Sequence, residues 1–204
     1  MRQNGGGHST DYGKTHNTRE VLKYLETAEA ITLIGKAVPQ GPATWADFGA
    51  GDGTFTRALW ELLGPGSRIY AVDRDPDVLA PLTRWAEAAR AEVIPVVADF
   101  TGRLVLPGLE ERGLDGILLA NALHFVAEGE RVLRRLVALI RPGGRFILVE
   151  YDRRRASRWV PFPVPPGRFF QLALSAGLSA PGVVSTRPSA FGGTLYAAMA
   201  ERMV

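Results

Sequence analysis

The chain of 204 residues contains no cysteine and only three histidines, His8, His16 and His124. Disulfide bonds and thiolate metal sites are therefore excluded. Because the histidines include no HExxH-type pair, we expect no bound metal. The absence of cysteine is also consistent with a reducing compartment, and we expect a cytoplasmic protein.

Long apolar runs are also absent. The longest of them, such as residues 116–123, are much shorter than the roughly 20 residues that a membrane-spanning helix needs. Residues 1–18 are polar and glycine-rich and lack the apolar stretch of a secretory signal. We therefore expect a soluble protein that has no membrane partner.

Lysine is scarce, since Lys14, Lys23 and Lys36 are the only lysines among 24 basic residues. The net charge is +3, and a nucleic-acid partner would need a denser basic stripe than this balance provides. The arginine-rich run 153–158 with Trp159 could still hold phosphates and stack on a base. A solvated loop, enriched in arginine by coding bias, is the alternative interpretation.

Strand-like and helix-like segments alternate along the centre of the chain. We expect strands at residues 44–48, 68–72, 93–98, 116–120 and 145–151, and helices at 54–63, from 76 and at 128–140. Asp75 is expected to cap the second of these helices, with Pro76 at its first position. The runs 93–98 and 116–120 are almost entirely apolar, which is typical of strands covered on both faces. This alternation predicts parallel crossovers and an open α/β sheet flanked by helices.

The two ends of the chain have different patterns. Thr18 is expected to cap a helix that runs to about residue 34, with Leu25, Ala28 and Ile31 on its apolar side. Residues 152–167 are rich in Arg and Pro and predict a long loop before a short helix at 169–175. No helical segment separates 183–187 from 194–200, so we expect these strands to form an antiparallel pair.

Polar side chains follow four successive predicted strands. The first strand leads into a glycine-rich turn at residues 47–53, and Asp73 follows the second. The third strand is followed by Asp99 and Phe100, and the fourth by Asn121. Ligands of open parallel sheets bind beyond the carboxyl ends of the strands. We therefore expect these residues to share one cleft.

The residue types in this cleft predict the parts of a ligand. Glycines in the turn let a ligand approach the backbone, and the helix beginning at Thr54 directs free N–H groups towards an anionic group. Asp73 is suited to accept both hydroxyls of a ribose. Asp99 can accept from an exocyclic amine, and Phe100 can stack on an adenine ring. The predicted ligand therefore has an anionic end, a ribose and an adenine.

Two other nucleotide-binding classes fit the sequence less well. A nicotinamide-dependent dehydrogenase has a GxGxxG turn, but this chain has Thr54 where the last glycine belongs. That class also has no special use for Asp99 and Phe100. A P-loop is excluded because no GK[ST] follows the glycines.

Residues 45–151 resemble the class I S-adenosylmethionine-dependent methyltransferases. The likeness rests on the segments DFGAGDGTF, YAVDRDP, VVADF, LDGILLANALHFV and LIRPGGRFILVEY. The resemblance implies a Rossmann-like, doubly wound α/β sheet of seven strands, mostly parallel with one antiparallel strand near the C-terminus. It also implies S-adenosylmethionine as cofactor and S-adenosylhomocysteine as product. One methyltransferase domain would span residues 18–204, with a cofactor-binding core at 44–151, a variable substrate-side loop at 152–168 and a flexible arm at 1–17.

The resemblance also assigns roles to the residues at the strand ends. The expected cofactor-binding residues are Asp47, Gly49, Ala50, Gly51, Asp52, Gly53, Asp73, Arg74, Asp99, Phe100 and Asn121. The glycine turn would lie along the methionine part of the cofactor, Asp73 at the ribose hydroxyls and Asp99 at the adenine amine. Asn121 would lie near the methionine part or the reacting centre.

Methyl transfer from a sulfonium needs alignment and exclusion of water, and a general base only where the acceptor loses a proton. His124, three residues after Asn121, is the candidate base. Tyr12, His16 and Tyr151 are candidate substrate-side residues, whereas Glu150 is expected to be structural. We expect a small-molecule acceptor. An RNA or protein acceptor, and a non-catalytic scaffold or sensor that binds the cofactor, stay open.

Overall fold

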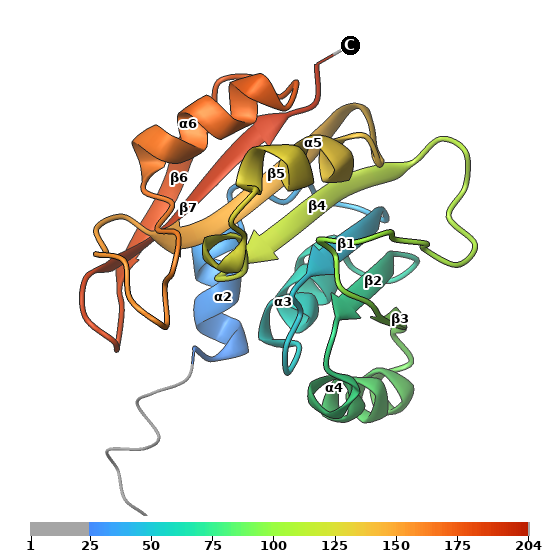
Figure 1. Ribbon diagram of the computed structural model, residues 1–204. Helices are drawn as coiled ribbons and strands as arrows, with labels where there is room; N and C mark the ends of the chain where they lie inside the picture. Colours follow the sequence, from blue (N-terminus) through green and yellow to red (C-terminus); the bar gives the residue numbers. More distant parts are fainter. Residues whose placement is uncertain (1–24, 204) are drawn as a thin grey trace, which may run out of the picture.

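The computed structural model describes residues 25–203 as a twisted sheet with helices on both faces (Figure 1). The strands are β1 (Thr44–Phe48), β2 (Arg68–Asp73), β3 (Glu92–Val97), β4 (Leu114–Ala120), β5 (Ile140–Tyr151), β6 (Gly182–Pro188) and β7 (Thr194–Glu201). The helices are α2 (Thr27–Ile34), α3 (Thr54–Leu63), α4 (Pro76–Ala89), the 3₁₀ turn η1 (Leu123–Phe125), α5 (Gly129–Val137) and α6 (Pro166–Ser175).

The sheet has seven strands in the order β3-β2-β1-β4-β5-β7-β6. All pairs from β3 to β5 are parallel, and β7 is antiparallel to both of its neighbours, β5 and β6. The expected doubly wound sheet with one antiparallel strand is therefore confirmed. The strand order reverses between β1 and β4, which is the switch point where such sheets bind ligands.

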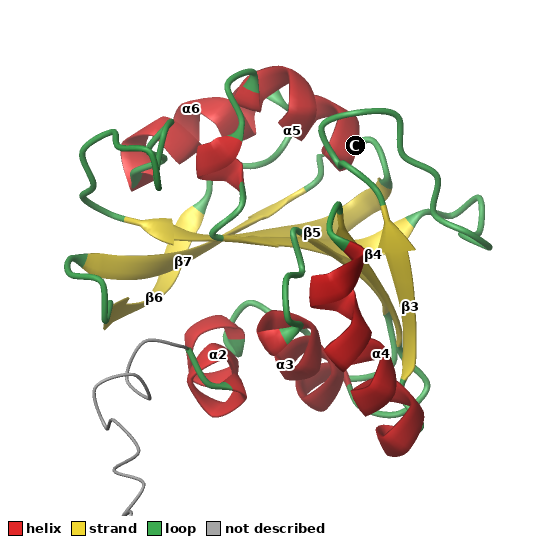
Figure 2. Ribbon diagram, turned by 60° about the horizontal axis from the view of Figure 1, so that its bottom comes forward, coloured by secondary structure: helices red, strands yellow, loops and turns green. Residues whose placement is uncertain are grey.

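The two faces of the sheet carry separate layers of helices. Figure 2 shows α2, α3 and α4 on one face and α5 and α6 on the other. Successive residues of β4 alternate between these layers, since Ile117 and Leu119 pack in the α5–α6 core and Leu118 in the α2–α3 core. This alternation follows from the two-residue period of a strand. It confirms that 116–120 is covered on both faces.

The same expectation is wrong for residues 93–98. In the structure β3 lies at the edge of the sheet and pairs with β2 alone, and the side chain of Val97 is 59% exposed. Pro95 lies within this strand. Because proline has no N–H to donate, it is confined to edge strands and bulges, and it was the local sign of an edge.

The first described helix is shorter than expected. The backbone of Glu26 is extended, its N–H donates to the Glu29 carboxylate at 3.0 Å, and the helix begins only at Thr27. A helix running continuously from Thr18 to residue 34 is therefore wrong within the described part, and Thr18 lies outside it. The buried residues of α2 are Ala30, Leu33 and Ile34. Of the predicted apolar side, Leu25 and Ile31 are partly buried and pack against this core, whereas Ala28 is exposed.

Two other boundaries also differ from the expectation. The helix expected to reach residue 140 ends at Val137, and β5 begins at Ile140 instead of residue 145. Ile140 pairs with Leu114, after which the register of β4 and β5 shifts, so the segment RPGG is a bulge within the strand. Helix α6 begins at Pro166. Proline is tolerated in a first helical turn. The expected long loop therefore ends before residue 167.

The cap of α4 is as expected: Asp75 accepts a hydrogen bond from the Asp77 N–H at 2.9 Å, with Pro76 at the first position. The longest helix of the described residues is α4, with 14 residues. No helix between residues 25 and 203 is both long and apolar enough to cross a bilayer.

Candidate active site

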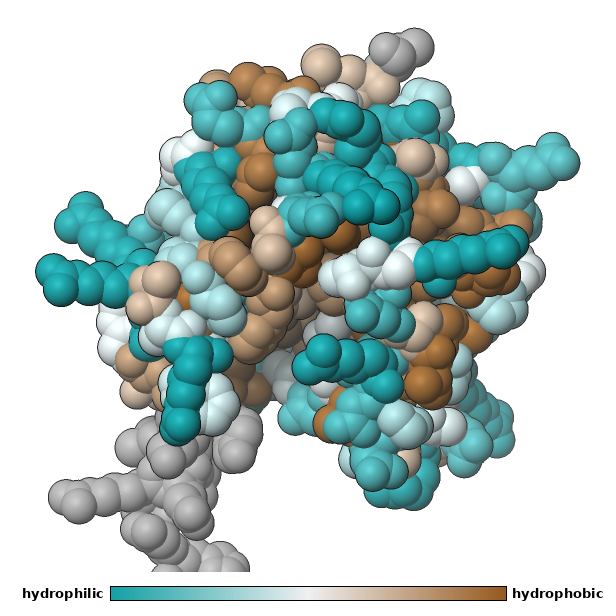
Figure 3. Space-filling model, viewed as in Figure 1, coloured by the Kyte–Doolittle hydropathy of each residue, from teal (hydrophilic) through white to brown (hydrophobic). Residues whose placement is uncertain are grey.

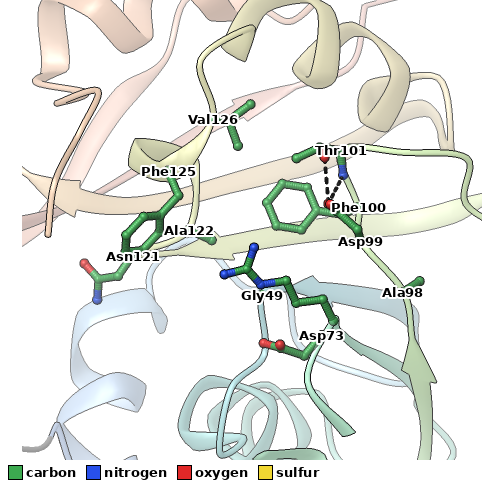
Figure 4. A pocket seen from close by; sticks show the side chains of 11 residues that line it. Gly49, Asp73, Ala98, Asp99, Phe100, Thr101, Asn121, Ala122, Phe125 and Val126 are labelled. Atoms are coloured by element: carbon green, nitrogen blue, oxygen red, sulfur yellow. Dashed lines mark hydrogen bonds between the residues drawn. The ribbon is translucent and has the colours of Figure 1, made fainter. Parts of the chain in front are cut away.

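A cavity of about 340 Å³ lies at the switch point of the sheet. The strand register places its walls, since Phe48 is opposite both Val72 and Leu119, and Asp73 is opposite Val97. The residues that follow these strands therefore meet at one edge. Six of the eleven predicted cofactor residues line the cavity (Figure 4): Gly49, Asp73, Arg74, Asp99, Phe100 and Asn121.

The glycine turn brings β1 close to the end of β4. Gly49 has φ +77°, and a Cβ there would lie 2.7 Å from the Cβ of Ala122. At Gly51, by contrast, a Cβ would meet no atom within 4 Å, so the backbone faces open space there. Its N–H donates to Oδ2 of Asp73 at 2.9 Å. Glycine adopts the left-handed backbone of both positions at low cost, and at Gly49 it also permits the close approach to Ala122.

The other predicted residues of the turn do not line the cavity. Ala50 and Gly53 are buried, Gly51 is partly buried and Asp52 is exposed. Oδ1 of Asp52 accepts from the N–H and the hydroxyl of Thr54, at 3.2 and 3.0 Å. One of the helix amides that were expected to face a ligand is therefore already bound within the turn.

Asp47 is buried beneath the turn instead of in the cavity. Oδ2 accepts from the Thr56 hydroxyl at 2.7 Å, and Oδ1 is buried without a hydrogen-bond partner among the described residues. Burial raises the pKa of Asp47 to about 7, and the nearby charges of Asp73 and Asp52 act in the same direction. Removing a carboxylate from water disfavours its charged form.

Asp73 is held from both sides by the backbone. One oxygen accepts from Gly51, and Oδ1 accepts from the Asp75 N–H at 3.0 Å. Each carboxylate oxygen has two lone pairs, so both oxygens retain capacity for further donors. The two backbone hydrogen bonds fix the carboxylate in place before any ligand binds.

Asp99 and Phe100 form the opposite wall of the cavity. Oδ1 of Asp99 accepts from the N–H and the hydroxyl of Thr101, at 2.8 and 2.7 Å (Figure 4). The side-chain and then the backbone hydrogen bond of Thr101 hold the pKa of Asp99 below its usual value. Both bonds use the same oxygen, so Oδ2 stays available. The ring of Phe100 packs 6.1 Å from that of Phe48 and is half-buried.

Asn121 has an unusual backbone and an unpaired side chain. Its φ is +52°, a region that asparagine enters more readily than most residues but that still carries strain. Its N–H donates to the Val149 carbonyl at 2.8 Å. Its Oδ1 is buried with no partner among residues 25–203. Buried acceptors are rarely left unpaired, so this oxygen fits a ligand that brings a donor, such as an ammonium group.

His124 does not line this cavity, although it was predicted to act at the site. It is 3% exposed, and Glu150 at the end of β5 is fully buried. The Nδ1 atom of His124 lies 2.7 Å from Oε2 of Glu150, and the His124 N–H donates to Oε1 at 3.1 Å. Glu150, expected to be structural, therefore fixes both the ring and the backbone of His124. An acid at the end of an otherwise apolar buried strand was the signal for this partner.

Tyr151, a predicted substrate-side residue, contacts the segment after β5. The half-buried ring of Tyr151 lies 6.2 Å from that of His124, and the Arg154 guanidinium carbon is 4.4 Å from the Tyr151 ring centroid. Arg154 also donates to the Phe191 carbonyl and, at 3.0 Å, to the Gly192 carbonyl in the turn between β6 and β7. Tyr12 and His16 lie outside the described residues.

Other cavity residues were not predicted from the sequence. They are Ala98, Thr101, Ala122, Phe125 and Val126. Phe125 is 56% exposed, and its ring lies 4.3 Å from that of His124. In the space-filling view, apolar side chains border the hollow near the centre of the face shown (Figure 3). No cluster of His, Asp or Glu suited to a metal ion occurs among residues 25–203.

The other arginines of the loop after β5 do not line the cavity. Arg153, Arg155 and Arg158 are exposed. Trp159 is 68% exposed, with the Arg158 guanidinium 4.6 Å from its ring centroid.

Comparison with known proteins identifies the family. Residues 46–146 match the family model of the methyltransferase domain. Demethylmenaquinone methyltransferase of Thermus thermophilus is 30% identical over 68% of this chain and 56% of its own length. A hybrid PKS-NRPS synthetase of Emericella nidulans is 32% identical over 51% of this chain but only 3% of its own length. The chain thus spans less than two thirds of either relative.

Solved structures show the same fold. The 1,6-didemethyltoxoflavin-N1-methyltransferase of Burkholderia thailandensis, with bound 1,6-didemethyltoxoflavin and S-adenosylhomocysteine, aligns with a TM-score of 0.68. It is 22% identical, and the alignment covers 87% of this chain and 78% of that one. A SAM-dependent methyltransferase of Aquifex aeolicus aligns with a TM-score of 0.65 at 15% identity, over 88% and 100% of the two chains.

The family model covers the strand ends that build the cavity, and the solved relatives share its sheet. The chain belongs to the class I S-adenosylmethionine-dependent methyltransferase family.

Proposed function

We propose that the protein transfers a methyl group from S-adenosylmethionine to a small-molecule acceptor. The observation that carries this proposal is that Asp73, Asp99, Phe100 and Asn121 line one cavity at the switch point, where Oδ1 of Asn121 has no partner among the described residues. These groups match the ribose, the adenine and the ammonium of one ligand. If the same side chains faced separate regions of solvent, they could not all bind one ligand.

The residues present fit the cofactor part by part. Asp73, already fixed by two backbone amides, would accept the ribose hydroxyls. Asp99 would accept the adenine amine through Oδ2, and Phe100 would lie against the ring. Asn121 would accept from the ammonium through its buried Oδ1. The bound cofactor supplies an electrophilic methyl group on a sulfonium sulfur.

The His124–Glu150 pair supports an acceptor that loses a proton. When Glu150 accepts the Nδ1 proton, the neutral ring keeps Nε2 as a proton acceptor. A carboxylate that holds the imidazole in one tautomer and orientation is a recurring arrangement for a general base. We propose that His124 removes the acceptor's proton as its oxygen, nitrogen or carbon bonds to the methyl group. Glu150 then stabilises the charged ring.

The apolar surroundings of this pair favour a small molecule as acceptor. Phe125 and Val126 line the cavity next to His124, and Tyr151 lies on another side of the ring. The names of two similar proteins refer to methylation of demethylmenaquinone and of 1,6-didemethyltoxoflavin. These names support a small-molecule acceptor.

The cofactor is tested by calorimetric titration with S-adenosylhomocysteine and with NADH. Binding of the first alone is expected, and binding of NADH alone would overturn the assignment. Transfer of labelled methyl groups from S-adenosylmethionine into metabolite and RNA pools then tests the acceptor. Label in small metabolites supports the proposal. Label in RNA, with binding that weakens steeply with salt, would favour the macromolecular alternative, and cofactor binding without transfer to any pool would favour a scaffold.

A further inference from the structure

The loop that carries Asp99 and Phe100 is held by an arginine from the far side of the cavity. Arg135 on α5 directs its guanidinium to three successive backbone carbonyls of this loop. It donates to the Thr101 carbonyl at 2.8 Å, to the Phe100 carbonyl at 3.2 Å and also to the Gly102 carbonyl. We define residues 99–102 as the adenine loop.

All the hydrogen bonds of the Arg135 head group within the described residues go to these carbonyls, and it forms no ion pair with a carboxylate there. Its neighbours on α5 differ, since Arg131 pairs with Glu128 at 2.8 Å and Arg134 with Glu130 at 2.7 Å. Both neighbours are exposed, whereas Arg135 is half-buried. A guanidinium presents five donors in a rigid plane, so one arginine can hold several carbonyls in a fixed geometry that the three donors of a lysine ammonium do not impose.

We infer that Arg135 is a positioning residue that sets the adenine loop for recognition of the adenine ring and its amine. The loop follows an edge strand and has no second strand beside it. Its internal bonds run from Thr101 to the Asp99 carboxylate and from the Gly102 N–H to the Asp99 carbonyl at 2.9 Å. These bonds shape the turn but do not attach it to the body of the protein. Phe100 packs against the core, and the guanidinium of Arg135 attaches the backbone of the loop by hydrogen bonds.

The attachment also links the two sides of the site. Arg135 lies on the helix that follows η1, the turn that carries His124 and Phe125. A second cavity of about 310 Å³ is lined by Thr101 of the adenine loop, Phe125 of η1 and Arg135. The arginine therefore spans from the acceptor-side helix to the cofactor-side loop.

This inference rests on the proposed cofactor, and its test separates the two. Arg135→Gln and Arg135→Lys are compared with the wild type, and Arg131→Gln on the same helix is the matched control. Each protein is titrated with S-adenosylhomocysteine and with S-inosylhomocysteine, which lacks the adenine amine. Hydrogen–deuterium exchange of Thr101 and Gly102 is measured on the same proteins without ligand.

We expect Arg135→Gln to bind S-adenosylhomocysteine on the order of tenfold more weakly. It should also lose most of the preference over the inosyl compound and exchange its loop amides faster. Arg135→Lys keeps the charge near Asp99 but not the planar fork, so it should behave like the glutamine variant. Arg131→Gln should match the wild type. A uniform loss for both ligands would indicate only a structural role and would overturn the inference.

Other outcomes are equally decisive. Wild-type selectivity in Arg135→Lys would show that charge alone acts, and unchanged exchange in Arg135→Gln would show that the loop does not need this residue. Either result overturns the inference while leaving the cofactor assignment intact. If the wild type fails to bind S-adenosylhomocysteine at all, the proposed function itself fails.

Discussion

Two buried carboxylates mark the two sides of the site and differ in their surroundings. Asp47, on the cofactor side, has one oxygen bound by a hydroxyl and the other without a partner in the described residues. Glu150, on the acceptor side, has both oxygens bound by His124. An isolated buried carboxylate favours its neutral form, whereas a paired one can orient a base. The two acids therefore differ in their partners although each is the penultimate residue of an inner strand of one sheet.

The two sides also differ in how the chain builds them. Cofactor-side residues directly follow parallel strands, so the sheet register fixes where they lie. Acceptor-side residues lie on η1 and on the loop after β5, which are held by bonds between distant segments. The Phe162 N–H donates to the His124 carbonyl at 2.9 Å, and the Tyr196 hydroxyl donates to the Val164 carbonyl at 2.7 Å. Variants on the cofactor side should therefore change cofactor binding, and variants on the acceptor side should change the rate of methyl transfer.

The largest effect is expected on the acceptor side, from His124→Gln. Loss of a general base lowers kcat by about 10² to 10⁴-fold, while the affinity for S-adenosylhomocysteine should stay within about twofold because His124 does not line the cofactor cavity. Methyl-transfer kinetics and calorimetry on the same preparation measure both. An unchanged melting temperature excludes unfolding as the cause. A kcat equal to that of the wild type would show that the acceptor needs no base from His124.

The second effect belongs to the cofactor side. Asp73→Ala should weaken binding of S-adenosylhomocysteine by about 100-fold, because two charge-assisted hydrogen bonds to the ribose are lost. Calorimetric titration measures this change. Asp77→Ala is the control, since Asp77 is an exposed acid in the first turn of α4 that does not line the cavity. Equal affinity of the two variants would remove Asp73 from the cofactor site.

The cofactor side should also show a dependence of stability on pH. The pKa of Asp47 is raised from 3.8 to about 7, so the folded chain holds this proton more tightly than the unfolded chain. The resulting stability is fully present at low pH and is lost as the pH rises through about 7. Relative to Asp47→Asn, the wild type should therefore lose about 2 kcal/mol of unfolding free energy from pH 5.5 to 7.5. Urea unfolding at several pH values measures the difference.

A second variant sharpens this test. Thr56→Val removes the hydroxyl that donates to Asp47 and that favours the charged form. The pH at which stability is lost should then move upwards. A difference between wild type and Asp47→Asn that stays constant over this pH range would show that Asp47 does not titrate there.

The contrast between the two sides also explains what the sequence could predict. Asp73, Asp99 and Asn121 were predicted to share one cleft, and they do so because each lies at or within two residues of the end of a parallel strand, where topology determines position. The edge position of β3 depends on the strand order, which only Pro95 indicated locally. The Arg135 contacts and the burial of His124 against Glu150 join segments that are 26 or more residues apart. The acid at the end of an apolar strand marked Glu150 but not its pairing with His124, and no local pattern marked the Arg135 contacts.

The smallest effect is expected from the exposed arginines after β5, and it separates a small acceptor from RNA. Arg155 and Arg158 are exposed, and neither lines the cavity. The double variant Arg155→Gln/Arg158→Gln should therefore keep kcat/KM for a small acceptor within about twofold, since exposed charges away from a site contribute little. Each phosphate contact that is lost would instead reduce the salt dependence of RNA binding by nearly one unit of slope. A smaller slope together with loss of transfer to RNA would therefore establish this loop as an RNA-binding surface and exclude the small acceptor.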